Sequence, residues 1–129
     1  MTNITYTGNL VTDLKTSDLQ TEATKKLALT ALEALKADQV EVLDVRKVAS
    51  FTDYMIFASG SSRRHVCAIA ESVVEAAEAA GQAPVGVEGE DIGEWVLVDL
   101  GDVVVHVMLP DVRRYYELEK LWGEELAAS

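Results

Sequence analysis

The chain has 129 residues and a mass of 14.0 kDa, which is the size of one ordinary domain and is long enough to bury a core without disulfides or metals. Hydrophobic residues make up 49% and charged residues 26%, so the composition is globular. Acidic residues outnumber basic ones by 22 to 11, and the net charge of −11 argues against extended binding to a nucleic-acid backbone or an acidic membrane. A basic protein is the macromolecular partner that this charge favours.

Signals for secretion or membrane insertion are missing from the sequence. Its one cysteine, Cys67, excludes an internal disulfide and a Cys-rich zinc cluster, and no run approaches the ~20 apolar residues of a membrane span. Residues 1–16 lack the basic start and apolar stretch of a secretory signal, so we expect a cytoplasmic location. Because residues 1–16 are polar and rich in threonine, we predict a flexible extension there, followed by one domain over 17–129.

The first part of this domain predicts a helix and two strands. Ser17 and Gln20 form a capping box, which predicts a helix over 18–36. Alternating apolar residues predict a half-buried strand over 40–45. A nearly continuous apolar run then predicts a central strand over 51–58, covered on both faces.

The second part predicts a helix, three strands and a last helix. Apolar residues recur at helical spacing over 66–77, and Gly81 stands where a C-terminal cap belongs. Residues 84–87 are predicted to form a short edge strand. Two β-branched runs over 95–100 and 103–109 predict two further strands, joined by a two-residue turn, Gly101-Asp102. Asp111 caps the last helix. The predicted elements are thus a helix, two strands, a helix, three strands and a last helix. This order predicts a single α/β domain with a mixed β-sheet flanked by helices.

A turn of the type that binds phosphate stands between the second strand and the second helix. Ser59-Gly60-Ser61-Ser62 offers free N–H groups at a helix start, where the dipole favours an anion. Serine and glycine are also the ordinary residues for turning the chain and capping a helix, and the motif is neither a Walker loop nor a dinucleotide fingerprint. A structural turn is therefore favoured over a nucleotide site.

No other constellation defines a reaction or a metal site. His65, His106 and Cys67 lack the local spacing of a zinc site, and we favour a surface role for His65 and a hydrogen-bonded role in the sheet for His106. Ser61 or Ser62 with His65 has no third group to complete a nucleophilic triad. We therefore expect no catalytic residue, no metal and no cofactor.

Aromatic residues are concentrated near the C-terminus. Trp95, Tyr115, Tyr116 and Trp122 all lie between positions 95 and 122. Tryptophan and tyrosine are typical anchors of protein interfaces, although any single ring is as easily part of the core. The last helix has more apolar positions than one core-facing stripe needs, so some of these rings are expected at the surface.

Three segments carry a resemblance to a known family. Residues 52–66 (TDYMIFASGSSRRHV), 95–107 (WVLVDLGDVVVHV) and 113–122 (RRYYELEKLW) resemble, in order and spacing, the signatures of the ribosomal silencing factor family, RsfS, also called Iojap. The resemblance covers about residues 17–126. It implies a nucleotidyltransferase-like fold, but the Asp-x-Asp pair that catalysis on that fold would need is missing after the Ser59-Gly60-Ser61 turn.

The resemblance implies a function without catalysis. Members of this family bind the large ribosomal subunit through its protein uL-fourteen, block joining of the small subunit and repress translation under nutrient limitation. The resemblance also implies a homodimer when free, and we expect no direct DNA binding and no membrane binding. The alternative is a nucleotide-binding or nucleotidyltransferase-type enzyme that uses the Ser59-Gly60-Ser61 turn.

The aromatic clustering and the last two signatures together predict a docking surface for the ribosomal protein. Its weaker members, expected to order the site, are His106 and Arg113. The other predicted members are Trp95, Asp99, Asp102, Tyr115, Tyr116, Glu119 and Trp122.

Overall fold

The computed structural model describes residues 5–117 and residue 120, and its elements follow the predicted order. Within these residues the helices and strands are α1 (Thr5–Ala34), β1 (Asp38–Asp44), β2 (Tyr54–Ser59), α2 (Arg63–Ala79), β3 (Gly86–Glu88), β4 (Trp95–Asp99), β5 (Val103–Met108) and α3 (Pro110–Tyr116).

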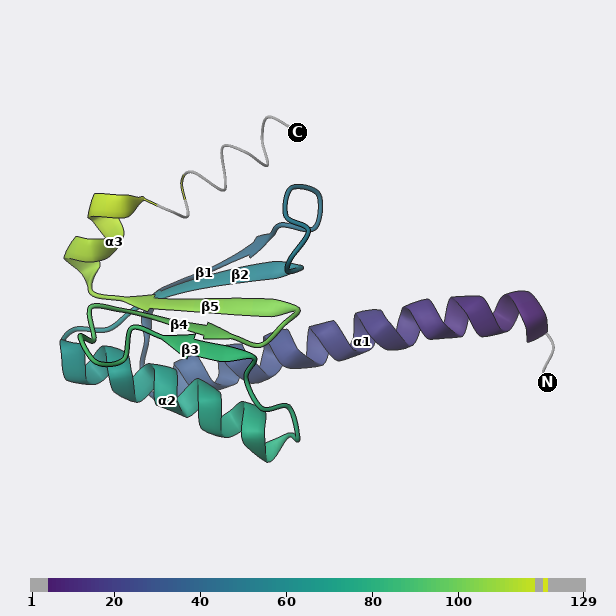
Figure 1. The fold of residues 1–129 in the computed structure, drawn as a ribbon, viewed down its shortest axis with the longest axis horizontal. Helices are drawn as coiled ribbons and strands as arrows, with labels where there is room; N and C mark the ends of the chain where they lie inside the picture. Colours follow the sequence, from purple (N-terminus) through teal and green to yellow (C-terminus); the bar gives the residue numbers. More distant parts are fainter. Residues whose placement is uncertain (1–4, 118–119, 121–129) are drawn as a thin grey trace.

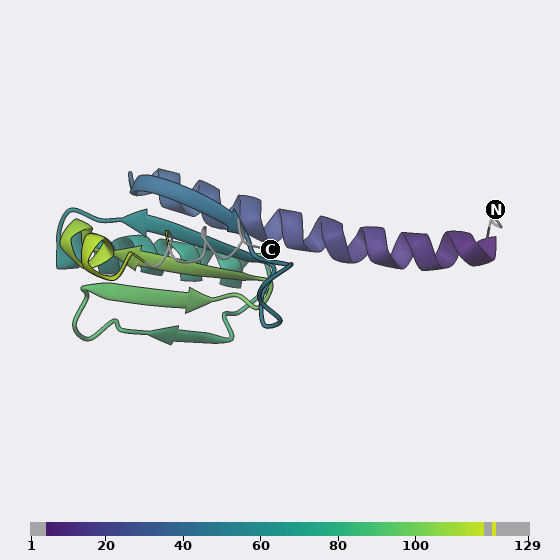
Figure 2. The same cartoon turned by 90° about the horizontal axis from the view of Figure 1, so that it is seen from above.

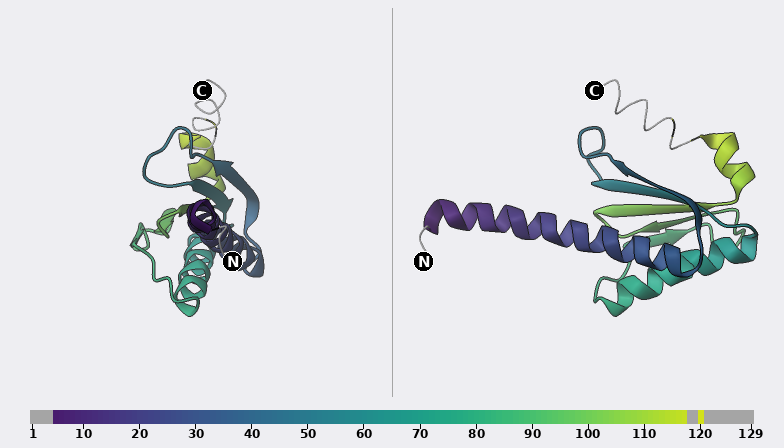
Figure 3. Two further views of the ribbon diagram at one scale, coloured as in Figure 1. Left: turned by 90° about the vertical axis from the view of Figure 1, so that its right-hand side faces the viewer. Right: turned by 180° about the vertical axis from the view of Figure 1, so that it is seen from behind.

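One mixed sheet organises the fold, as predicted. Its strand order is β1-β2-β5-β4-β3, in which β2 and β5 are parallel and the other pairs are antiparallel (Figure 2). Helices α1 and α2 cover one face, and α3 lies on the other (Figures 1 and 3). The predicted single α/β domain with a mixed sheet flanked by helices is confirmed.

The two interior strands β2 and β5 separate two clusters of buried side chains. All six residues of each strand are buried, which explains their nearly continuous apolar sequences. Val103, Val105 and Val107 of β5 face the helices α1 and α2, where the larger cluster lies. On the opposite face Met108 of β5 packs with Phe57 of β2 in a smaller cluster. Side chains that alternate along β5 therefore belong to different layers.

Helix α1 begins earlier than predicted. It starts at Thr5, so the predicted N-cap Ser17 lies inside the helix, and it ends at Ala34. The stretch 9–17 contains no proline or glycine, and a serine inside a helix costs only about 0.5 kcal/mol, so a capping box did not stop the helix there. The first turns of α1 extend away from the sheet (Figures 1 and 2). The flexibility of residues 1–16 stays a prediction.

The predicted end of α2 is confirmed, whereas the predicted start of α3 is wrong. Gly81 has a φ of +78° directly after the C-cap Ala80, which confirms that it terminates α2. Asp111, by contrast, is not the cap of α3, because the N-cap is Leu109 and Pro110 occupies the first turn. The fixed φ of a proline suits the first helical position, so Pro110 starts the helix one residue before the expected cap. No helix in the described part of the chain is long and apolar enough to cross a membrane.

Gly89 gives a test of the loop before β4. Its φ is +93°, and a Cβ built there would lie 2.1 Å from the backbone oxygen of Trp95. We expect Gly89→Ala to lower the free energy of unfolding by about 3 kcal/mol, because left-handed strain adds to a backbone clash. Gly81→Ala is the matched control, since its φ is +78° with no atom within 4 Å of the new Cβ, and about 1 kcal/mol is expected. Urea denaturation measures both, and equal losses would contradict the clash.

Candidate functional site

Five rings form a continuous chain from the core to the surface, and we call them the aromatic chain. Successive ring centroids are 4.9, 5.9, 5.1 and 5.0 Å apart. Such spacings are those of interacting aromatic pairs. The members, in order from the core outward, are Phe57, His106, Trp95, Tyr116 and Tyr115.

Sheet register explains why these rings meet. Parallel pairing sets Phe57 of β2 opposite His106 of β5, and the two rings stack with an interplanar angle of 11°. Antiparallel pairing sets Leu97 of β4 opposite His106, so Trp95 is the diagonal neighbour of His106 on the same face. Helix α3 follows β5 after one residue and brings Tyr116 over Trp95.

The buried imidazole of His106 is held by Trp95. The Trp95 indole N–H donates to His106 Nδ1 at 3.1 Å, which requires Nδ1 to be without a proton. His106 is only 6% exposed. Burial lowers the pKa of His106 to about 4, because the charged imidazolium would lose its water. The neutral ring therefore belongs to the folded state, in agreement with the expected hydrogen-bonded role in the sheet.

This depressed pKa predicts a loss of stability in mild acid. Between pH 6.5 and 4 the unfolded chain binds a proton at His106 that the folded chain does not, so the free energy of unfolding falls as the pH falls through this window. The contribution amounts to at most about 3 kcal/mol. His106→Gln retains an acceptor for Trp95 but does not titrate, so its stability should vary less with pH. Urea titrations of both proteins from pH 7 to 4 measure the difference, and identical pH dependence would disprove the assignment.

Exposure increases along the aromatic chain. Phe57 is fully buried, Trp95 is half-buried, Tyr116 is 53% exposed and Tyr115 is 80% exposed. Tyr115 meets Tyr116 edge to face, at an interplanar angle of 88°. The two tyrosines are thus presented to solvent while their inner neighbours are rooted in the core.

The other predicted docking residues are distributed differently. Arg113 is buried and its Nη1 donates to Ser59 Oγ at 2.9 Å, so it fastens α3 to the end of β2. Asp99 and Asp102 lie at the far end of the β4–β5 hairpin, roughly 14 Å along the strand from Trp95. Glu119 and Trp122 lie outside the described residues.

Both aspartates accept hydrogen bonds from within the fold. Asp99 Oδ1 accepts from the backbone N–H of Gly101 at 2.8 Å, inside the hairpin turn. Asp102 Oδ2 accepts from Thr21 Oγ1 of α1 at 3.1 Å. Their positions therefore have structural explanations that the sequence did not reveal.

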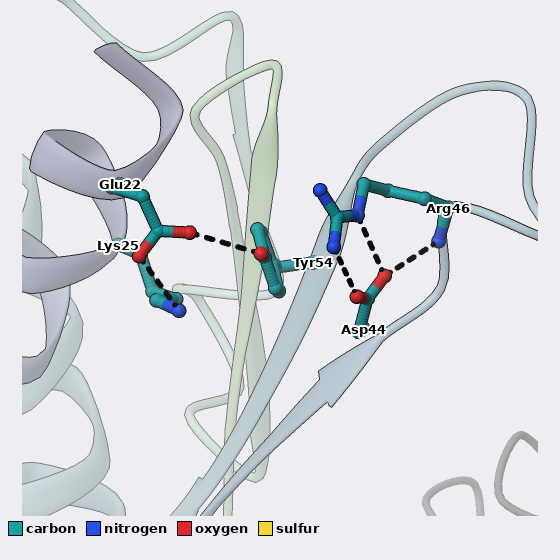
Figure 4. Close-up of polar contacts among 5 residues, drawn as sticks. All are labelled: Glu22, Lys25, Asp44, Arg46 and Tyr54. Carbon is teal, nitrogen blue, oxygen red and sulfur yellow. Dashed lines mark hydrogen bonds and ion pairs between the residues drawn. The ribbon is translucent and has the colours of Figure 1, made fainter. Parts of the chain in front are cut away.

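A second polar cluster was missed by the sequence reasoning. Tyr54 of β2 donates its hydroxyl to Glu22 Oε2 of α1 at 2.9 Å, and its ring lies between two cations, with Lys25 Nζ 4.4 Å and Arg46 Cζ 5.3 Å from the centroid (Figure 4). Arg46 is in turn paired with Asp44 (Figure 4). Burial raises the pKa of Tyr54, so the phenol stays protonated as a donor. The cluster connects α1 to the sheet, and its sequence signal was a tyrosine at the start of a buried strand.

Tyr54→Phe tests this connection. The variant removes only the hydroxyl, so Glu22 loses one partner, and we expect a loss of about 1 kcal/mol in the free energy of unfolding. Tyr116→Phe is the matched control, because that ring is half exposed and a change within about 0.5 kcal/mol is expected at such a site. Thermal and urea denaturation should separate the two variants, and an unchanged Tyr54→Phe would show that the hydroxyl contributes nothing.

The N–H groups of Gly60 and Ser61, in the turn at 59–62, already donate to acceptors within the protein. The N–H of Ser61 donates to His65 Nδ1 at 2.9 Å, and the N–H of Gly60 donates to Met108 O at 3.1 Å. His65 Nε2 is 2.7 Å from Leu35 O, so this ring ties the turn to the end of α1 instead of standing free at the surface. Ser62 is the N-cap of α2 and accepts from the N–H of His65. This geometry is that of a structural turn.

Metal ligation is not indicated in the part of the chain that the structure describes. No group of three or more His, Cys, Asp or Glu side chains there could hold a metal ion.

Comparison with known proteins assigns the family. Residues 18–128 match the model of the family described as ribosomal silencing factor during starvation, RsfS. Ribosomal silencing factor RsfS of Chromobacterium violaceum is 50% identical over 105 residues, which are 81% of this chain and 86% of that protein. The chain belongs to the ribosomal silencing factor family.

Two further similarities agree with this family assignment. An X-ray crystal structure of a protein from Chromobacterium violaceum superposes with a TM-score of 0.78 at 52% identity, covering 79% of this chain and 85% of that one. The mouse protein named mitochondrial assembly of ribosomal large subunit protein 1 is 35% identical over 99 residues, covering 74% of this chain and 43% of that protein. The predicted resemblance is confirmed.

Proposed function

We propose that the protein binds the large ribosomal subunit through its protein uL-fourteen, sterically blocks joining of the small subunit and so represses translation under nutrient limitation. Membership of the silencing-factor family and the name of the mouse relative support an association with the large subunit. A cytoplasmic site of action and a function without catalysis accompany this proposal.

The observation that carries the proposed docking site is the aromatic chain. Tyr115 is strongly exposed and Tyr116 is half exposed. Tyr116 nevertheless packs on Trp95, which is fixed by His106. Rings that are held before binding lose little conformational entropy on docking, and buried aromatic rings are typical hot spots of interfaces.

Charge supports a basic partner. The chain carries −11, and a ribosomal protein that binds RNA is basic, so complementary charge would speed encounter and set orientation. Asp99 and Asp102, at the far end of the β4–β5 hairpin, are proposed as a separate acidic contact with the same partner. Arg113 is proposed as a positioning residue, since it is buried and holds α3 under the tyrosines.

Tyr116→Ala is the central test. We expect it to weaken binding to purified uL-fourteen by about 30-fold, because a hot-spot ring contributes about 2 kcal/mol, and to restore joining of the subunits in the presence of the protein. Phe51→Ala is the matched control, an exposed aromatic residue in the loop between β1 and β2, and it should bind as the wild type does. Pull-down and light scattering measure the two effects. Absence of wild-type binding, with subunit joining unhindered, would refute the proposal.

We also propose a homodimer when free, formed through the same aromatic surface. Exposed tyrosines of this kind would bury well against a second copy, so dimer formation and docking on the ribosomal protein would compete. Sedimentation of the wild type with increasing amounts of uL-fourteen should show the dimer giving way to a one-to-one complex. A complex that retains two copies of the chain would show that the two surfaces are separate.

A further inference from the structure

A hollow beside the aromatic chain gathers cations on this acidic protein. It has a volume of about 270 Å³ and lies between the start of β1 and helix α3. Three of its lining side chains, Arg113, Arg114 and Lys120, are positive. Two of the chain's 11 basic residues thus stand on the same short helix as the exposed tyrosines, and a third stands just beyond it.

The hollow is built around a fixed guanidinium. Arg113 is 6% exposed and its Nη1 is bound to Ser59 Oγ, so one wall is held in place. The side chains of Arg114 and Lys120 are 71% and 65% exposed and are free to adjust to a ligand. Gln39, with a φ of +47°, adds an uncharged polar group from β1.

Two carboxylates, Asp38 and Glu117, also line the hollow. The carboxylates that pair with the exposed cations hold them weakly. Arg114 pairs with Asp111, and Lys120 Nζ lies 3.9 Å from Glu117, which is too far for a good hydrogen bond. Exposed ion pairs of this kind contribute at most about 1 kcal/mol each. A phosphate oxygen, which accepts strong charge-assisted hydrogen bonds from arginine and lysine, can replace these carboxylates.

We propose that this hollow receives a phosphodiester group of ribosomal RNA when the aromatic chain docks on the large subunit. The inference rests on the proposed function for the docking pose, because Tyr116 and Arg114 are on one helix and a partner that reaches the first brings its neighbouring RNA to the second. The net charge opposes wrapping of RNA around the whole protein, but contact with one or two phosphates needs only a local group of cations.

The test compares two double variants that each remove two positive charges. Arg114→Gln/Lys120→Gln changes the two adjustable cations of the hollow. Lys26→Gln/Lys47→Gln changes two exposed lysines on α1 and on the loop after β1, so it matches the loss of charge. All four side chains are at the surface, so both variants should fold as the wild type does.

Affinity for purified large subunits is measured at several KCl concentrations, and affinity for isolated uL-fourteen is measured beside it. For the hollow variant we expect affinity for the subunit about fivefold lower at low salt and a salt slope reduced by about 1 to 2, with unchanged affinity for isolated uL-fourteen. The lysine control should keep the wild-type slope.

Equal slopes for the two double variants would overturn the proposal. An equal loss of affinity for isolated uL-fourteen would overturn it as well, because the cations would then contact protein. Failure of the wild type to bind uL-fourteen, with the expected change of slope on the subunit retained, would refute the proposed docking partner and support the phosphate contact.

Discussion

The pairing of β5 with β2 on one side and with β4 on the other determines where every ring of the aromatic chain lies. The side chains of β5 alternate between the layer under α1 and α2 and the opposite layer, so a slip of one residue would turn His106 toward the helices and a valine toward Trp95. The two-residue turn at Gly101-Asp102, in which Gly101 has a φ of +91°, allows only one register for β4 and β5. The surface proposed for docking therefore depends on a turn at the other end of the hairpin.

Burying the His106 ring away from water would destabilise the fold if the ring had no hydrogen-bond partner. The partner that it has, Trp95, also orders the surface. Trp95 donates the hydrogen bond to Nδ1 and Phe57 supplies the stacked ring, so the imidazole is held as a neutral acceptor at Nδ1. The same hydrogen bond fixes the orientation of the indole on which Tyr116 packs. The same contacts therefore stabilise the core and hold the surface rings in place. A change at His106 is expected to affect both.

Much of the fold could be predicted because its signals are local. Alternation, apolar runs and glycine turns gave every element in the right order, whereas the start of α1 was wrong, because a cap at Ser17 is a local preference that helix propagation overcame. The candidate site was predictable only in part. Trp95 and Tyr116 could be chosen as aromatic residues, but the role of Phe57 depends on parallel pairing between strands far apart in the sequence. The hydrogen bond from Thr21 to Asp102 likewise joins residues 81 positions apart, which no local pattern reveals.

The acidic composition and the cationic hollow are compatible because charges act over a limited range. At physiological ionic strength exposed charges are screened beyond about 8 Å, so a phosphate beside Arg114 senses mainly the groups that line the hollow and little of the net −11. The net charge acts mainly during encounter, where it would favour approach by a basic protein and oppose approach by bare RNA. A surface of this kind would accept RNA only after docking on protein has placed a phosphate within reach. Selectivity for a site where both are present would then follow from the order of the two contacts, since neither charge distribution provides it alone.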